Sequence, residues 1–143
     1  MRGNLVSLKT ESERTLFFDF LPIDLGQIRG YKVFYRASRR LILRGADAVV
    51  FVADSQSARL DANVEAMLDL RENLDELRAP LASLPCVMQH NKRDLDDIEP
   101  IEGPRALLNP MGAPEVESAA ASGVGVTETL RAAARLVLRR LAA

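Results

Sequence analysis

The chain has 143 residues, a formal net charge of −1 and an apolar content of 48%. This length suits a single domain with one core, so we expect one domain over residues 1–143. The near-neutral charge excludes a chain built mainly to neutralise nucleic-acid phosphates, which requires a basic excess. One cysteine and one histidine, Cys86 and His90, exclude an intrachain disulfide and a Cys/His zinc site.

We expect no targeting segment at the start of this sequence. Met1-Arg2-Gly3-Asn4 leads into a mixed polar stretch rather than the apolar core of a signal peptide. No apolar run approaches the length of a membrane span. We therefore expect a cytoplasmic protein without an integral membrane segment.

The amino-terminal part is expected to contain an antiparallel hairpin at the edge of a sheet. Residues 6–13 are polar and loop-like, whereas residues 14–24 are rich in aromatic side chains and partly alternating, as in a strand. Pro22 favours an edge position or the end of that strand. Residues 25–30 indicate a hairpin turn, and residues 31–35 indicate the returning strand.

A short basic helix is expected over residues 36–44, closed by Gly45. Its arginines suit either an anionic partner or a solvated helix face, and the near-neutral total charge favours the solvated face. These arginines are Arg36, Arg39, Arg40 and Arg44.

From residue 48 onward the predicted strands and helices alternate. The continuously apolar residues 48–53 predict a strand buried on both faces, and residues 86–90 predict the next strand. Residues 58–77 between them have apolar side chains at helical spacing. A short helix at residues 101–108 and a short strand at residues 114–118 follow. This order is typical of an α/β fold, with a parallel sheet covered by helices.

A last helix follows the loop that contains Gly123 and Gly125, and Thr127 can cap its first turn. Apolar residues at helical spacing are expected to face the core, with arginines on another face. The apolar residues are Leu130, Ala134, Val137, Leu138 and Leu141.

The motif that indicates a chemistry is Asn91-Lys92-Arg93-Asp94, directly after a predicted strand. Ligands of α/β proteins gather at the carboxyl ends of strands. Asp94 can accept two hydrogen bonds from the edge of guanine, and adenine offers no such pair of donors. Lys92 can lay its stem along the face of a base, and the Asn91 amide can join neighbouring loops. The alternative is a polar strand end that leads into an ordinary loop.

Several segments together resemble the small Ras-like GTPases of bacterial gliding motility and cell polarity, the MglA type. The segments are RTLFFDFLP at 14–22, RASRRLILRG at 36–45, VFVADS at 50–55, NKRDL at 91–95 and GVGV at 123–126. They follow the family's order, and the resemblance extends from about residue 3 to the end of the chain. It implies a small-GTPase-like parallel sheet flanked by helices, with an antiparallel edge hairpin.

The resemblance implies a guanine site made of Asn91, Lys92 and Asp94. It also implies a second guanine loop at residues 118–121, where the backbone N–H of Ala120 reaches the base oxygen. A connector of small residues is the alternative for this loop. The implied ligands are GTP, GDP and Mg²⁺.

The resemblance implies two further roles near the aromatic strand. Thr15 would meet Mg²⁺ and the terminal phosphate of GTP, and Arg14 would neutralise charge on the transferred phosphoryl group. From the residue pattern alone, an exposed strand start is favoured for both residues. The implied partners are guanine nucleotide, a roadblock-type GTPase-activating protein, and polarity and motility proteins.

Two parts of the family pattern are absent from this sequence. The chain contains no Gly-Lys pair and hence no P-loop, which the family places, with a first strand, before the point where this chain begins. A further strand and a Gly-Gln switch would fall between about residues 32 and 34, and Gly26-Gln27 lies in the predicted turn instead. Omitted parts of a longer protein, a truncated gene product and a remodelled domain all remain open as explanations.

These absences leave more than one function open. A guanine-nucleotide switch with GTP hydrolysis is the first hypothesis, although the missing P-loop leaves open whether this chain is an enzyme. The alternative is a nucleotide-incompetent, GTPase-like module that binds partners. Asp54 and Lys92 at strand ends also suit a phosphoacceptor receiver domain, but Lys92 is better explained within the Asn91–Asp94 motif. Asp54 is then expected to cap a helix or order a loop.

Overall fold

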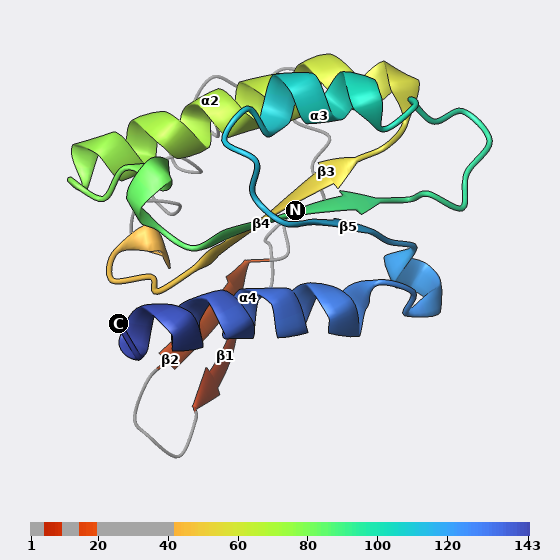
Figure 1. The fold of residues 1–143 in the computed structure, drawn as a ribbon. Helices are drawn as coiled ribbons and strands as arrows, with labels where there is room; N and C mark the ends of the chain where they lie inside the picture. The colour runs from red at the N-terminus through yellow and green to blue at the C-terminus, as the bar shows by residue number, and fades with distance from the viewer. Residues whose placement is uncertain (1–4, 10–14, 20–41) are drawn as a thin grey trace. The chain divides into compact units, whose positions relative to one another are not determined.

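The structure is a computed structural model, and it describes residues 5–9, 15–19 and 42–143 (Figure 1). The chain divides into two units, Met1–Ile42 and Leu43–Ala143. The predicted single domain over residues 1–143 and its expected gaps stay predictions.

The first unit contains an antiparallel strand pair. Strand β1 (Leu5–Lys9) pairs with β2 (Thr15–Asp19) in a register that matches Leu5 with Asp19 and Lys9 with Thr15. The prediction of a loop over residues 6–13 is therefore wrong for the residues of β1. Leucine and valine favour a strand there, and the ladder with β2 supplies partners for the backbone.

Strand β2 lies within the predicted aromatic strand, but its described partner differs from the predicted one. The expected edge hairpin, which joined residues 14–24 to residues 31–35, is not seen, and residues 31–35 lie outside the described part. The predicted turn at residues 25–30 and most of the basic helix at residues 36–44 also lie outside it.

The second unit is built on a parallel sheet, which confirms the α/β prediction for this part. Its strands are β3 (Val49–Asp54), β4 (Cys86–Asn91) and β5 (Glu115–Glu117), in the order β3-β4-β5. The β3–β4 register runs from Val49 opposite Cys86 to Asp54 opposite Asn91. The two strands therefore end level at one edge of the sheet.

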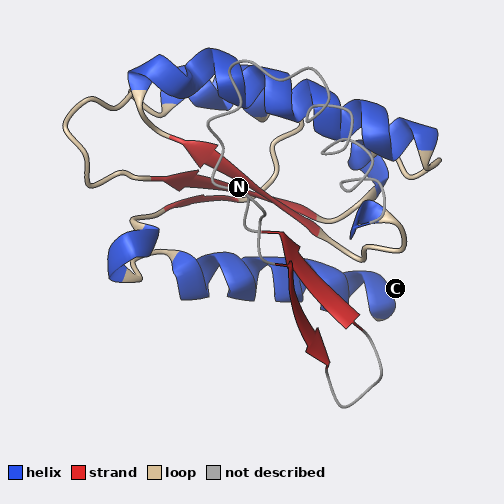
Figure 2. Cartoon of the chain, turned by 180° about the vertical axis from the view of Figure 1, so that it is seen from behind, coloured by secondary structure: helices blue, strands red, loops and turns tan. Residues whose placement is uncertain are grey.

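Helices cover both faces of this sheet (Figures 1 and 2). The long α2 (Leu60–Glu76) and the short α3 (Glu102–Leu108) lie on one face, and α4 (Val126–Leu141) lies on the other. Single 3₁₀ turns, η1 (Ser57–Arg59), η2 (Leu81–Ser83) and η3 (Ala120–Ser122), stand in the connections. Among the described residues, no helix has the length and apolarity that crossing a lipid bilayer requires.

The main core lies between the sheet and α2. It contains apolar residues of β3, β4, α2 and α3, including Phe51, Ala53, Met67, Leu70, Leu74, Met88 and Leu108. Cys86 also belongs to this core, as expected for a small apolar residue, and burial raises the pKa of its thiol.

Strand β3 is buried on one face only, so the prediction of burial on both faces is wrong for residues 43–143. Val49 and Phe51 are buried, but Val50 and Val52 between them are 40% and 53% exposed. The reason is that α4 packs mainly over the central strand β4 and covers less of the edge strand β3. All residues of β4 from Cys86 to His90 are buried.

Helix α4 also presents a different face from the predicted one. Of the five residues expected to face the core, Val137 is half-buried and the others are exposed: Leu130, Ala134, Leu138 and Leu141. The buried residues of the helix are Thr129 and Ala133. A buried hydrogen bond of 2.8 Å from Gln89 Nε2 of β4 to Thr129 Oγ1 fixes this rotation, because an unpaired amide there would be costly.

The start of α4 corrects the prediction that Thr127 caps it. Gly125 is the N-cap, with φ 78°, in a region that favours glycine. A Cβ at this position would overlap Ser118 and the carbonyl oxygen of Glu117. The predicted loop glycine is thus required by a close approach of two backbone segments.

The core predicts the stability effects of two leucines on α2. Leu74 has no exposed surface, whereas Leu68 on the same helix is 54% exposed. Leu74→Ala should lower the free energy of unfolding by about 2–5 kcal/mol, since it leaves a cavity. Leu68→Ala should change it by no more than about 0.5 kcal/mol. Urea denaturation of both variants measures this, and equal losses would contradict the described packing.

Candidate functional site

The carboxyl edge of the sheet collects polar side chains from three strands. Strand β3 ends at Asp54, β4 ends at Asn91, and β5 is followed by Ser118. Because all three strands are parallel, their carboxyl ends meet at the same edge. The structure therefore brings the Asn91–Asp94 motif next to residues 118–121, the two segments that the sequence predicts as guanine loops.

Asn91 ties these two segments together. Its Oδ1 accepts hydrogen bonds from Ser118 Oγ at 3.1 Å and from the backbone N–H of Ala120 at 2.9 Å. Two backbone hydrogen bonds support the tie, from Ser118 N to His90 O at 2.8 Å and from Arg93 N to Ser118 O at 3.0 Å. The amide of Asn91 thus fixes the spacing between the loops.

Lys92 turns its backbone sharply and reaches across to β3. Its φ is 64°, a left-handed conformation that a residue with a side chain seldom adopts. Lys92 Nζ lies 2.8 Å from Asp54 Oδ2 and 3.2 Å from Gln56 Oε1. The ammonium group is therefore engaged at the end of the neighbouring strand.

The residue pattern did not predict this contact of Asp54 and Gln56 with Lys92. Asp54 was expected to cap a helix or order a loop, and the loop role is present, because Asp54 Oδ1 accepts a hydrogen bond from Gln56 N at 3.0 Å. The available signal was an acidic residue at the end of one parallel strand and a lysine just past the end of the next. Only the register places them level.

Asp94 differs from its neighbours because its side chain is free. Arg93 is engaged, with Nη1 2.7 Å from Glu99 O and Nε 3.3 Å from Glu117 Oε1. Asp94 is exposed, and its carboxylate has no hydrogen-bond or ion-pair partner in the described part of the chain. A carboxylate beside two tied loops is available to accept hydrogen bonds from a ligand.

The remaining predicted site residues are placed only in part. The N–H of Ala120 donates to Asn91, so in this arrangement it is not free for a base oxygen. Thr15 is the first residue of β2 in the first unit, and Arg14 lies outside the described residues. Their roles with phosphate and Mg²⁺ stay predictions. The described residues contain no group of three or more His, Cys, Asp or Glu side chains suited to a metal ion.

His90 lies on the opposite face of β4 from the Asn91 side chain, in a buried polar cluster. It is 2% exposed, and its Nε2 lies 3.7 Å from Glu115 Oε1 without a hydrogen bond to the described residues. Glu115 accepts hydrogen bonds from Asn109 Nδ2 at 2.8 Å and from Arg105 Nε at 2.7 Å. The Glu115 carboxylate is thus satisfied by other donors.

The environment shifts the pKa values of both His90 and Glu115. Burial lowers the pKa of His90 below its ordinary value of 6.5, and the carboxylate of Glu115 opposes this less strongly. Arg93 also lowers the pKa of His90, and Glu117 raises it. Burial alone would raise the pKa of Glu115, but the hydrogen bonds from Asn109 and Arg105 outweigh it and lower the pKa. We therefore expect a neutral His90 in the folded chain at pH 7.

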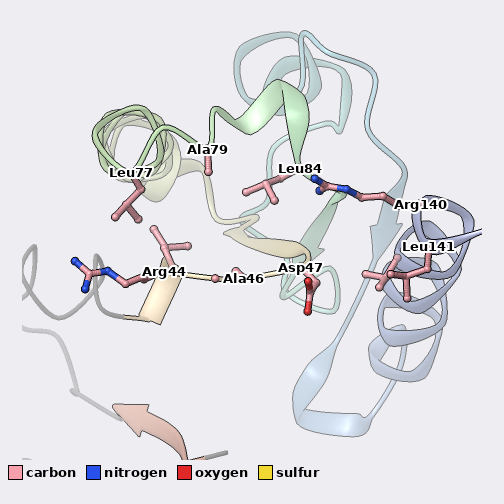
Figure 3. A pocket seen from close by; sticks show the side chains of 11 residues that line it. Arg44, Ala46, Asp47, Leu77, Ala79, Leu84, Arg140 and Leu141 are labelled. Carbon is pink, nitrogen blue, oxygen red and sulfur yellow. The ribbon is translucent and has the colours of Figure 1, made fainter. Parts of the chain in front are cut away.

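A separate pocket of about 510 Å³ lies at the other end of β3 (Figure 3). It is lined by residues just before β3 and by the end of α4, including Leu43, Arg44, Asp47, Leu84, Arg140 and Leu141. The pocket contains none of the predicted guanine-site residues, because these follow the carboxyl ends of the strands.

The lowered pKa of the buried His90 predicts a pH dependence of stability. The unfolded chain takes up the proton near the ordinary pKa, whereas the folded chain does so at lower pH. Stability is therefore full above the ordinary pKa and falls as the pH drops through it, by up to about 1.4 kcal/mol per pH unit. His90→Gln should lack this component.

Urea denaturation of the wild type and of His90→Gln between pH 7.5 and 5.5 measures this difference. His90 is the only histidine, so no other imidazole titrates in this range, and the remaining titratable groups are common to both proteins. Parallel pH profiles would contradict a neutral, buried His90.

No family model matches the chain. The mutual gliding-motility protein MglA of Myxococcus xanthus (strain DK1622) is 51% identical to it over 151 aligned residues, which cover 98% of the chain and 77% of that protein. Because the aligned span exceeds the chain's 143 residues, the relative has residues within it that lack a counterpart here.

Proposed function

The chain belongs to the MglA family of small Ras-like gliding-motility GTPases, and we propose that it binds guanine nucleotide as a molecular switch. The observation that carries this proposal is the free carboxylate of Asp94 beside two loops tied by Asn91. The similarity to MglA supports the family assignment, and the geometry at the carboxyl edge of the sheet supports guanine as the ligand.

The proposed recognition of guanine rests on hydrogen-bond matching. Asp94 would accept hydrogen bonds from the ring N–H and the exocyclic amine of guanine. Adenine would cover this carboxylate without offering it donors, and a binding site strongly rejects a ligand that buries a charged group unpaired. Lys92 would cover a face of the base with its aliphatic stem. Asn91 would keep the two loops at the spacing of the base.

The residues present fit the base better than they fit the phosphates. Nothing in the 143 residues supplies the Gly-Lys pair with which a P-loop holds phosphate. Bound Mg²⁺ would neutralise phosphate charge, and Thr15 is the residue proposed to contact it. Arg14 is proposed to stabilise charge during GTP hydrolysis. Affinity in this chain should therefore come mainly from the base.

We also propose motility and polarity proteins, together with a roadblock-type GTPase-activating protein, as partners. The absent Gly-Lys pair favours a second candidate function, a partner-binding module that has lost nucleotide binding. Exposed apolar residues of α4, such as Leu130 and Leu138, would then be available to a partner.

A binding experiment separates the two candidates. A fluorescent GDP analogue with Mg²⁺ should bind the chain saturably, and GDP should displace it whereas ATP should not. Asp94→Ala should weaken GDP binding by about tenfold or more, since hydrogen bonds to a charged group are lost. Asp96→Ala is the matched control, because Asp96 is also exposed in this loop.

Either of two outcomes would overturn the guanine proposal. One is a folded wild-type chain that binds no GDP, which would favour the partner-binding module. The other is GDP binding that Asp94→Ala and Asp96→Ala affect equally, which would place the ligand away from Asp94.

A further inference from the structure

We propose that Asp54, assisted by Gln56, is a positioning residue that anchors the Lys92 ammonium group so that the lysine stem is held ready for the face of guanine. This inference rests on the proposed guanine site and deepens it. The sequence resemblance assigns Lys92 to the base but gives no role to Asp54 or Gln56.

The anchor arises from the level ends of two parallel strands. Asp54 lies opposite Asn91 in the β3–β4 register, so Lys92 is the first residue past the ladder. Its backbone has a left-handed φ of 64°, and its side chain extends toward β3. There, Nζ meets Asp54 Oδ2 at 2.8 Å and Gln56 Oε1 at 3.2 Å. Two acceptors therefore fix one flexible cation.

The anchor is itself held in place. Asn63 of α2 is buried and bonds both backbone groups of Asp54, with Oδ1 3.1 Å from Asp54 N and Nδ2 2.8 Å from Asp54 O. The second carboxylate oxygen of Asp54 accepts from Gln56 N at 3.0 Å. Gln56 Nε2 donates to Asp97 Oδ2 at 3.3 Å. The carboxylate thus has one orientation, with Oδ2 directed to Lys92.

This arrangement matters for binding because a free lysine has many rotamers. If binding must order the four-carbon stem, the lost conformational entropy of the lysine weakens the affinity. A stem that is already anchored loses less entropy on binding. With Nζ held at β3, the stem spans from β4 to β3 along the carboxyl edge. The anchored stem would contact only the base, so its contribution to affinity should be the same for ligands with and without phosphates.

The first test compares guanosine, GDP and GTP by equilibrium binding. Asp54→Asn keeps the acceptor for Gln56 N but removes the charge that faces Lys92. This substitution should weaken the binding of all three ligands by the same factor, about threefold to fivefold, as expected for a partly exposed ion pair. Asp96→Asn is the matched control and should change none of them.

A double-mutant cycle shows whether Asp54 acts through Lys92. In a Lys92→Met background, which keeps the apolar stem without the ammonium group, Asp54→Asn should cause no further loss of guanosine affinity. An equal loss in both backgrounds would overturn the inference. So would a loss for GDP and GTP that guanosine does not share.

A second readout needs no nucleotide. The chain has three lysines, Lys9, Lys32 and Lys92, and mass spectrometry can follow the reductive methylation of each. In Asp54→Asn the Lys92 amine should react at least about twofold faster, because its ion pair is lost, while the other two lysines keep their wild-type rates. An unchanged Lys92 rate would overturn the anchor.

The two measurements distinguish a failure of the proposed function from a failure of the positioning role of Asp54. If the wild-type chain binds neither guanosine nor GDP, the proposed function and the role of Lys92 at the base are both overturned. A faster Lys92 reaction in that case would still show the Asp54 anchor. If the chain binds guanosine but Asp54→Asn changes neither affinity nor reactivity, only the positioning role is overturned.

Discussion

The parallel register of β3 and β4 is the constraint on which the candidate site depends. It places Asp54 opposite Asn91, so that both strands end at one level of the same edge. The ion pair between Asp54 and Lys92 exists only in this register, because a slip by one residue would turn every side chain to the other face. The core residues Phe51 and Met88, paired on the α2 side, maintain the register by their burial.

Strand β4 separates two kinds of polar group by its alternation. His90 lies in the buried cluster with Glu115, whereas Asn91 ties the loops and Gln89 bonds Thr129 of α4. The buried cluster and the tie between the loops thus involve neighbouring residues of one strand. The backbone carbonyl of His90 also accepts from Ser118 N, so the cluster and the loop tie share a backbone segment.

Local patterns predicted the strands and helices of the second unit and the position of the Asn91–Asp94 motif at a strand end. They failed where the outcome depends on neighbours. The exposure of Val52 follows from the edge position of β3, and the rotation of α4 follows from the bond between Gln89 and Thr129. Neither can be read from hydrophobic periodicity. The contact of Asp54 with Lys92 likewise needs the register, which a single sequence does not fix.

The most direct test of the account is a nuclear magnetic resonance titration of the isotope-labelled chain with GDP. The proposed guanine site lies between the loops that Asn91 ties together. The backbone amide signals of residues 91–94 and 118–120 should therefore shift with GDP and stay unchanged with equal ATP. Shifts centred on the pocket near Arg44 and Arg140, or an equal response to ATP, would contradict it.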